Sequence, residues 1–206
     1  MSAGLDTRQV RHAFGRAAAT YEAHAVLQAE VGTRLLERLD GIELKPDRVL
    51  DVGSGPGRGA DALRTRFPSA SVVALDIALP MLRAATTYIG QPPAFARVGA
   101  DAQALPFADA AFDLIHSNLC LQWCDDPGLA IVEFARVLKP GGMAFVEIGD
   151  SALGTYVVPG DEAIRKGAER AKLVVTATAA EERPNFYGKN RRETREEHLL
   201  MLTKPA

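Results

Sequence analysis

The stretch Val49–Gly57, with the sequence VLDVGSGPG, constrains the fold more than any other part of the chain. A short apolar run leads into an acid, Asp51, and glycine then recurs at every second position. Glycine permits positive φ values in a tight turn, and it lets a ligand approach backbone that a Cβ would block. The pattern is therefore typical of a strand, a cofactor-binding turn and a helix in succession.

The spacing of these glycines separates two classes of nucleotide cofactor. A dinucleotide turn has the pattern G-x-G-x-x-G, whereas glycine here occupies positions 53, 55, 57 and 59. Asp51 would repel a pyrophosphate, but it suits the ammonium group of a cofactor that carries an amino acid. A second apolar run, residues 71–76, ends in Asp76, which is placed to accept hydrogen bonds from both hydroxyls of a ribose. We therefore expect S-adenosylmethionine as the cofactor, with NAD as the alternative.

The composition fits one globular domain and limits its partners. The chain has 206 residues, of which 47% are apolar and 24% charged, and its net charge is −2. This charge gives no general attraction to nucleic acid, so no nucleic-acid partner is expected. Cys120 and Cys124 lack a second cysteine pair or a neighbouring histidine cluster, so no metal site is predicted. No apolar run reaches the length of a membrane span, and we expect a cytoplasmic protein.

Apolar periodicity, together with proline and glycine, predicts alternating strands and helices. Residues 6–39 have a helical pattern, and residues 1–45 are expected to form a helical lead-in or lid on a cofactor-binding domain of residues 46–206. Such alternation predicts an α/β, doubly wound, mostly parallel seven-stranded sheet with helices on both faces. The strands are expected at 48–52, 71–76, 95–99, 112–117, 143–148, 172–178 and 198–203, and the helices at 58–67, 80–88, 128–138 and 161–170.

Four motifs together resemble the class I S-adenosylmethionine-dependent methyltransferases, which have a Rossmann-like fold. They are DVGSGPG at 51–57, LD at 75–76, GADA at 99–102 and LKPGG at 138–142. A narrower resemblance, over residues 8–148, is to the malonyl-acyl-carrier-protein O-methyltransferases of biotin synthesis. It rests on FGRAAATYE at 14–22, ADAQALPF at 100–107 and SNLCLQW at 117–123.

The narrower resemblance implies a reaction and a partner. That family methylates the free carboxyl group of a malonyl thioester on acyl carrier protein, which masks its charge for the enzymes that elongate fatty acids. The family also carries a long segment after the fifth strand that caps the substrate pocket. Residues 149–206 look instead like the terminal helix and hairpin of a minimal methyltransferase.

The resemblance also assigns cofactor contacts, which all lie at the ends of expected strands. The methionine end of the cofactor would meet the glycine turn, the ribose would meet the acid after the second strand, and the adenine would meet the two following segments. The residues concerned are Asp51, Gly53, Ser54, Gly55, Gly57, Asp76, Ile77, Asp101 and Ala102. Asn118 and Leu119 follow the fourth expected strand, where open α/β sheets bind ligands, so they are also expected to contact the cofactor.

Methyl transfer to a carboxylate needs alignment more than it needs a base. A carboxyl group with a pKa near 4 is ionised at neutral pH, so no proton has to be removed. Tyr21 is our first candidate for positioning substrate or cofactor through its hydroxyl, and Arg16 is a candidate partner for an anionic substrate group. Gln122 and Trp123 are candidates for the pocket wall, and His116 is expected to be packed inside its strand.

Several alternatives remain open from the sequence. The alternatives to a carboxyl methyltransferase are a methyltransferase for another small molecule, a non-catalytic cofactor-binding subunit and an NAD-binding domain. Methylation of nucleic-acid bases is not expected, because Ser117–Cys120 lacks the Asn/Asp-Pro-Pro-aromatic turn of such enzymes. The basic side chains near the C-terminus either dock an acidic carrier protein or form a solvated loop with interleaved glutamates; they are Arg165, Lys166, Lys189, Arg191, Arg192 and Arg195.

Overall fold

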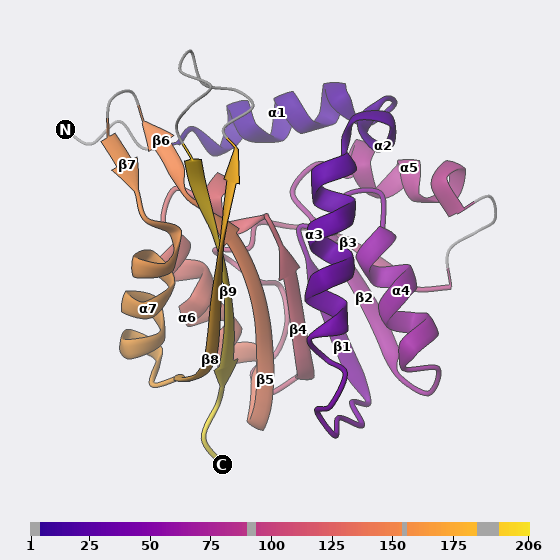
Figure 1. Cartoon of the computed structure of the whole chain (residues 1–206). Coiled ribbons are helices and arrows are strands. Elements are labelled where there is room, and N and C mark those ends of the chain that lie inside the picture. Colours follow the sequence, from indigo (N-terminus) through magenta and orange to yellow (C-terminus); the bar gives the residue numbers. More distant parts are fainter. Residues whose placement is uncertain (1–4, 90–93, 154–155, 185–193) are drawn as a thin grey trace.

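The computed structural model describes residues 5–89, 94–153, 156–184 and 194–206. Three helices come first, and strands and helices then alternate along the chain (Figure 1). In chain order the elements are α1 (Thr7–Ala17), α2 (Tyr21–His24), α3 (Val26–Glu37), β1 (Arg48–Val52), α4 (Arg58–Arg66), β2 (Ser71–Asp76), α5 (Leu79–Ile89), β3 (Ala96–Gly99), β4 (Phe112–Asn118), the short 3₁₀ helix η1 (Leu121–Trp123), α6 (Pro127–Val137), β5 (Leu138–Gly149), β6 (Ser151–Leu153), β7 (Tyr156–Val158), α7 (Gly160–Ala171), β8 (Val174–Pro184) and β9 (Thr194–Thr203).

The central sheet has seven strands in the order β3-β2-β1-β4-β5-β9-β8. The first five run parallel, and β9 is antiparallel to both β5 and β8. The predicted doubly wound, mostly parallel seven-stranded sheet is therefore confirmed. Because β1 pairs with both β2 and β4, the strand order reverses beside β1, and ligands of such sheets bind at this switch point.

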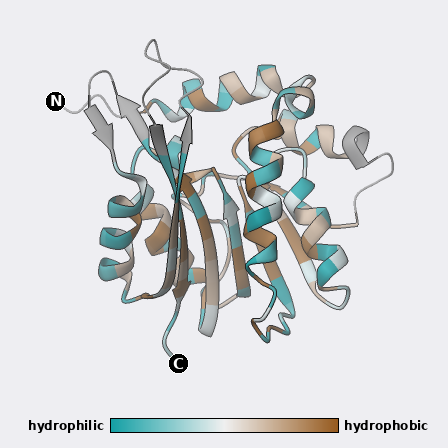
Figure 2. Cartoon of the chain, viewed as in Figure 1, coloured by the Kyte–Doolittle hydropathy of each residue, from teal (hydrophilic) through white to brown (hydrophobic). Residues whose placement is uncertain are grey.

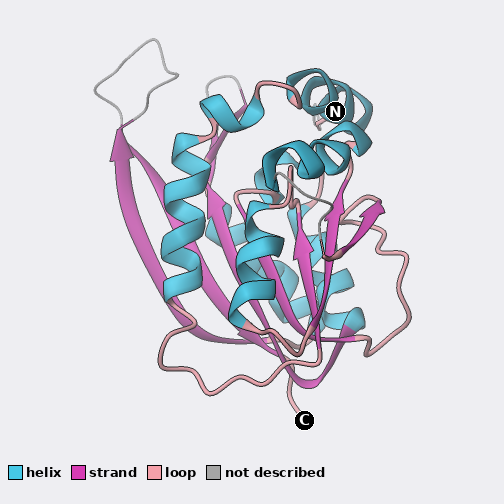
Figure 3. Ribbon diagram, turned by 90° about the vertical axis from the view of Figure 1, so that its right-hand side faces the viewer, coloured by secondary structure: helices cyan, strands magenta, loops and turns pink. Residues whose placement is uncertain are grey.

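Two layers of helices cover the sheet, because its strands are apolar on both faces (Figures 2 and 3). Neighbouring residues of β1 show this: Val49 packs in the cluster beneath α3, α4 and α5, whereas Leu50 packs in the cluster beneath α6 and α7. Phe134 of α6 and Leu63 of α4 are both fully buried in their respective clusters. Both faces of the sheet are thus buried, and the carboxyl ends of its strands remain to carry a site.

Several boundaries differ from the predicted ones, and each difference reflects a tertiary contact. The strand β5 begins at Leu138, before the glycine pair, because Leu138 pairs with Phe112 across a bulge. The strands β8 and β9 extend through polar residues that show no apolar alternation, and the β6–β7 hairpin was not predicted at all. Of the helices that the structure describes, none combines the length and the apolar character needed to cross a membrane.

Candidate cofactor site

A cavity opens at the switch point, beside the carboxyl ends of β1, β2 and β4. Its empty volume is about 800 Å³ with the open mouth and the solvent in front of it included. The helix α1 lies across this end of the sheet (Figure 1), and the N-terminal helices contribute Thr7, Val10, Phe14 and Tyr21 to the cavity wall. The lead-in and the sheet therefore build one site between them.

The turn after β1 is fixed against the end of β2. The N–H groups of Gly53 and Ser54 both donate to the carbonyl oxygen of Leu75, at 2.8 and 3.0 Å. Gly53 has φ +73°, and a Cβ there would lie 2.4 Å from both Cβ and Sγ of Cys120. Glycine is therefore required at position 53 by its backbone conformation and by the close approach of Cys120.

Asp76 anchors the centre of the site. Its Oδ2 accepts a hydrogen bond from the N–H of Gly55 at 2.9 Å, and its Oδ1 accepts one from the N–H of Ala78 at 2.8 Å. Burial raises the pKa of Asp76, although these two backbone hydrogen bonds oppose the shift. Each carboxylate oxygen has a further lone pair, so the side chain is oriented and still able to accept hydrogen bonds from a ligand.

The charged side chains on the cavity wall are both acids. Asp76 lies at the end of β2, and Asp101 lies in the loop that follows β3. No lysine or arginine from the described residues lines the cavity. A wall of this charge favours a ligand that carries positive groups and disfavours the pyrophosphate of NAD.

The loop after β3 brings Asp101 and Ala102 to the wall, as expected for the adenine side. Oδ1 of Asp101 accepts a hydrogen bond from the N–H of Gln103 at 2.9 Å. This local bond is the turn that acids commonly form at such positions. The side chain of Asp101 therefore stabilises the loop in addition to lining the cavity.

Arg136 of α6 holds the same loop in place, and it was not predicted from the sequence. Its guanidinium donates to the carbonyl oxygens of Leu105 and Phe107, at 2.8 and 2.7 Å. It also pairs with Glu133 one turn earlier, and Glu133 accepts a hydrogen bond from the N–H of Leu105 at 2.8 Å. The Glu133–Arg136 spacing was the only trace of this network in the sequence.

Asn118 and Leu119 lie on the wall at the end of β4, as predicted. The Nδ2 group of Asn118 donates to the carbonyl oxygen of Gln28 in α3 at 2.8 Å. Gly32 makes room for this contact, since a Cβ there would lie 2.8 Å from that Nδ2. Oδ1 of Asn118 is buried and has no hydrogen-bond partner within the described part of the chain, so it is available to a ligand.

Three aromatic side chains close the outer part of the cavity. The ring of Phe14 packs edge-on against Trp123, with centroids 5.4 Å apart, and against Tyr21 at 6.4 Å. Trp123 is 47% exposed at the cavity mouth, whereas Gln122 does not line the cavity. Burial, together with the negative charge of Asp76, raises the pKa of Tyr21 to about 12. Its hydroxyl is therefore a hydrogen-bond donor at neutral pH.

Both cysteines also line the cavity, which the sequence did not indicate. A hydrogen bond with Cys124, and then burial, raises the pKa of the Cys120 thiol well above its usual range. The thiol is therefore protonated and is a poor nucleophile. Cys120 contributes to the shape of the site rather than to chemistry.

The structure does not place Asp51, Ser54 and Gly57 on the cavity wall. Asp51 is 2% exposed, and its Oδ1 lies 2.7 Å from Nδ1 of His116, its register partner on β4. Oδ2 of Asp51 is buried and has no hydrogen-bond partner among the described residues, so the expected contact between Asp51 and the cofactor ammonium stays a prediction. A Cβ at Gly57 would lie 2.6 Å from Cζ of Phe95, so Gly57 faces the protein rather than the cavity. His116 is buried, as expected.

The basic side chains that the sequence suggested for binding the substrate or its carrier do not line the cavity where the structure describes them. Arg16 is exposed on α1 and does not line the cavity. In α7, Arg165 pairs with Asp161 at 3.2 Å, and Lys166 pairs with Glu162 at 2.6 Å. Residues Lys189, Arg191 and Arg192, and the side chain of Arg195, lie outside the described part of the chain.

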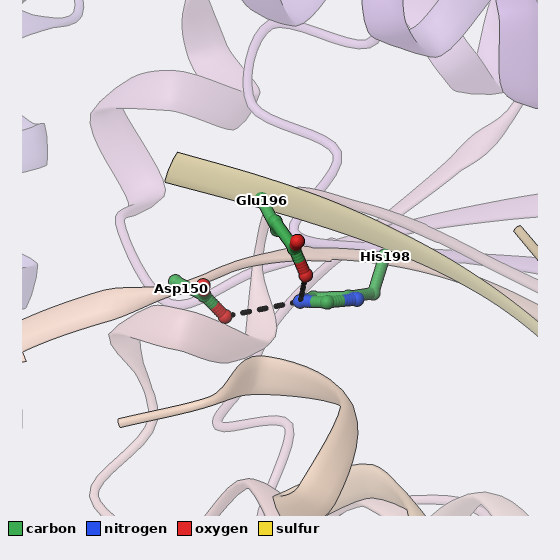
Figure 4. Close-up of side chains that lie close together, drawn as sticks. All are labelled: Asp150, Glu196 and His198. Carbon is green, nitrogen blue, oxygen red and sulfur yellow. Dashed lines mark hydrogen bonds and ion pairs between the residues drawn. The ribbon is translucent and has the colours of Figure 1, made fainter. Parts of the chain in front are cut away.

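A second polar cluster joins the end of β5 to β9 (Figure 4). Nε2 of His198 lies 3.1 Å from Oδ1 of Asp150 and 3.8 Å from Oε2 of Glu196. Oδ1 of Asp150 also accepts a hydrogen bond from the N–H of Gly160 at 3.0 Å, at the start of α7. The three side chains offer donor atoms within 4.8 Å of one another. Their hydrogen bonds tie β5, β9 and α7 together outside the cavity wall.

Comparison with known proteins gives a consistent result. Residues 50–146 match the family model described as a methyltransferase domain. The chain is 46% identical over 144 residues to malonyl-[acyl-carrier protein] O-methyltransferase of Xylella fastidiosa (strain M23), a match that covers 69% of this chain and 49% of that protein. For the protein of the same name from Methylovorus sp. (strain MP688), the identity is 44% over 156 residues, covering 72% and 53%. The chain thus spans about half the length of the curated relatives it matches.

Solved structures show the same fold. Phosphoethanolamine N-methyltransferase 2 of Haemonchus contortus, in complex with S-adenosyl-L-methionine, superimposes with a TM-score of 0.67 and 18% sequence identity. The superposition covers 85% of this chain and 52% of that one. At this identity the likeness establishes the architecture alone.

Proposed function

Because this chain carries a class I S-adenosylmethionine-dependent methyltransferase domain, we propose that the protein methylates the free carboxyl group of a malonyl thioester on an acyl carrier protein. The observation that supports this proposal best is the identity of 46% and 44% to proteins named malonyl-[acyl-carrier protein] O-methyltransferase. The aromatic and acidic cavity at the switch point supplies a matching site.

The residues of the cavity fit the proposed cofactor. Asp76 has acceptor capacity for the ribose hydroxyls, and the loop at Asp101 and Ala102, next to Ile77, offers a wall for the adenine. Gly53 and Gly55 expose backbone on the cavity wall for the methionine portion. When bound, S-adenosylmethionine supplies a methyl group activated by a positively charged sulfur. The two acids on the wall complement that charge.

The proposed chemistry needs no base from the protein. With the cofactor held by the residues named above, a carboxylate oxygen of the acceptor would form the new O–C bond as the S–C bond breaks, and the sulfur would keep the electron pair of that bond in a neutral thioether. The acceptor is already ionised, so no side chain on the cavity wall has to remove a proton from it. The protein contributes alignment and exclusion of water, and Phe14, Tyr21 and Trp123 are placed to provide both.

Two side chains on the wall are kept out of competing reactions. The thiol of Cys120 stays protonated because its pKa is raised, so it does not compete for the methyl group. Tyr21, with its pKa raised to about 12, remains a neutral donor that can orient substrate or cofactor. We therefore assign Tyr21 a positioning role.

We also propose that the reaction takes place in the cytoplasm and involves no nucleic acid. Both cysteines are free thiols, which suits a reducing compartment. The net charge of −2 gives no general attraction to a polyanion.

The test is the intact mass of malonyl-acyl carrier protein after incubation with the protein and S-adenosylmethionine. The expected result is a gain of one methyl group that an esterase removes. Carrier protein without the malonyl group is the control and should gain nothing. Binding of S-adenosylhomocysteine without any methyl gain would refute the proposed substrate. Displacement of bound S-adenosylhomocysteine by NAD would refute the proposed cofactor.

A further inference from the structure

The outer surface of α1 carries a row of positive side chains, which we call the basic face of α1. It consists of Arg8, Arg11 and Arg16, with His12 beside them, and all four are exposed. Their spacing places them on one side of the helix. The helix contains no acid, and Asp6 before it accepts a hydrogen bond from the N–H of Arg8 as the N-cap. In the described residues, none of the three arginines forms an ion pair.

The opposite side of α1 fixes the position of this face. Thr7, Val10 and Phe14 line the cavity. Gly15 lies between Arg8 and Arg11 around the helix and packs against Pro80 of α5, where an added Cβ would be 3.5 Å from Cγ, so α5 borders the basic face. The arginines therefore point away from the cavity while the same helix forms its wall. A partner bound to the basic face would lie next to the mouth, where Trp123 is also exposed.

The positive side chains of α7 are balanced locally, in contrast to those of α1. Arg165 and Lys166 of α7 pair with acids one turn earlier, and Arg170 lies 3.8 Å from Asp126. These ion pairs reduce the positive potential that α7 offers to a partner. The basic face of α1 differs because three arginines stand together with no acid within the helix. The chain as a whole has a charge of −2, so this face is a local exception to the overall charge.

We propose that the basic face of α1 is the docking surface for the acidic carrier protein that delivers the substrate, an inference that rests on the proposed function. Complementary charge raises the rate of encounter and fixes the orientation of the two proteins. Docking at this face places the carrier protein beside the cavity mouth. One side of α1 then forms the cavity wall, and another side binds the carrier protein. Trp123 adds an exposed aromatic contact of the kind that interfaces favour.

The experiment compares two double variants that each remove two positive charges. Arg8→Gln/Arg11→Gln removes unpaired charges from α1, and Arg165→Gln/Lys166→Gln removes paired charges from α7 as the matched control. Glutamine has nearly the same helix propensity as arginine and lysine. Each protein is assayed with malonyl-acyl carrier protein over a range of salt concentrations, and with malonyl N-acetylcysteamine thioester, which carries no protein. Binding of S-adenosylhomocysteine shows that the variants are folded.

For the α1 variant we expect kcat/KM with malonyl-acyl carrier protein to fall about tenfold, through KM, and its salt dependence to weaken. Activity with the small thioester and binding of S-adenosylhomocysteine should stay unchanged. The α7 variant should behave as wild type with both substrates. Equal activity of the α1 variant and wild type on the carrier substrate would overturn the docking surface. A wild-type protein that methylates neither substrate would instead overturn the proposed function.

Discussion

Replacing Gly53 by alanine tests how tightly the cofactor turn is packed. Gly53 has φ +73°, and a new Cβ would lie 2.4 Å from both Cβ and Sγ of Cys120. A left-handed conformation costs a residue with a Cβ about 1–2 kcal/mol. Relief of the overlap with Cys120 costs about 1–3 kcal/mol more, as in other overpacked cores. Gly53→Ala should therefore lower the free energy of unfolding by about 2–5 kcal/mol.

A second glycine separates these two contributions. Gly141 has φ +77°, nearly the same as Gly53, but a Cβ there would meet nothing within 4 Å. Gly141→Ala should therefore cost only the conformational part, about 1–2 kcal/mol. The difference between the two variants measures the overlap with Cys120 alone.

Urea unfolding of the cofactor-free protein, followed by circular dichroism, measures both variants. Adding Cys120→Gly to Gly53→Ala should recover the overlap contribution, because it removes both clashing atoms. Cys120→Ala should recover less, since its Cβ remains at the 2.4 Å contact. If Gly53→Ala costs no more than Gly141→Ala, the turn is free to shift and the argument for a preformed site is wrong.

Three further substitutions test individual parts of the site. Asp76→Asn should weaken binding of S-adenosylhomocysteine tenfold or more, measured by calorimetry. The pKa of Asp76 is raised in the folded protein, so the folded state is favoured while Asp76 is protonated, and this stability is lost as the pH rises through the raised pKa. Asparagine does not ionise, so Asp76→Asn should gain stability relative to wild type as the pH rises. Tyr21→Phe should lower the rate of methyl transfer about tenfold. The shape of the pH–rate profile should stay unchanged up to pH 9, since the tyrosine has a pKa of about 12. If the wild-type profile shows an ionisation between pH 7 and 9 that the variant lacks, the positioning role is wrong. Arg136→Ala should lower the free energy of unfolding by about 2–3 kcal/mol through loss of charge-assisted hydrogen bonds. Arg64→Ala is the control: it breaks a half-buried pair with Asp61 that holds no loop carbonyl, and it should cost less than about 1 kcal/mol.

The fold was predictable because its signals are local. Apolar runs ending in Asp51 and Asp76, separated by a glycine turn, specify two parallel strands and the helix between them without knowledge of distant contacts. The polar residues of β8 and β9 carry no such signal, because their pairing depends on one another and on β5. The same is true of the β6–β7 hairpin, which was therefore missed.

The candidate site was predictable where residues act through their position at a strand end. Nine of the twelve residues predicted for the site lie on the cavity wall. The sequence did not predict that α1 lines the cavity, because Val10 and Phe14 match only the general pattern of an amphipathic helix. Arg136 was missed for a different reason: it holds the loop through backbone carbonyl groups, and hydrogen bonds to the backbone leave no pattern in a sequence.

The position of Asp51 shows how an acid can support a cofactor site without lining it. Its Oδ1 binds His116 on β4, which links β1 to the strand that carries Asn118 two residues later. A Cβ at Gly59 would lie 2.9 Å from its Oδ2, so the carboxylate lies close under the first turn of α4, where the helix dipole favours negative charge. Asp51 thus connects the strand, the glycine turn, the helix and β4 at one point. The contact between Asp51 and His116 thus adds a side-chain link to the backbone pairing of β1 with β4, directly before the glycine turn that borders the cavity.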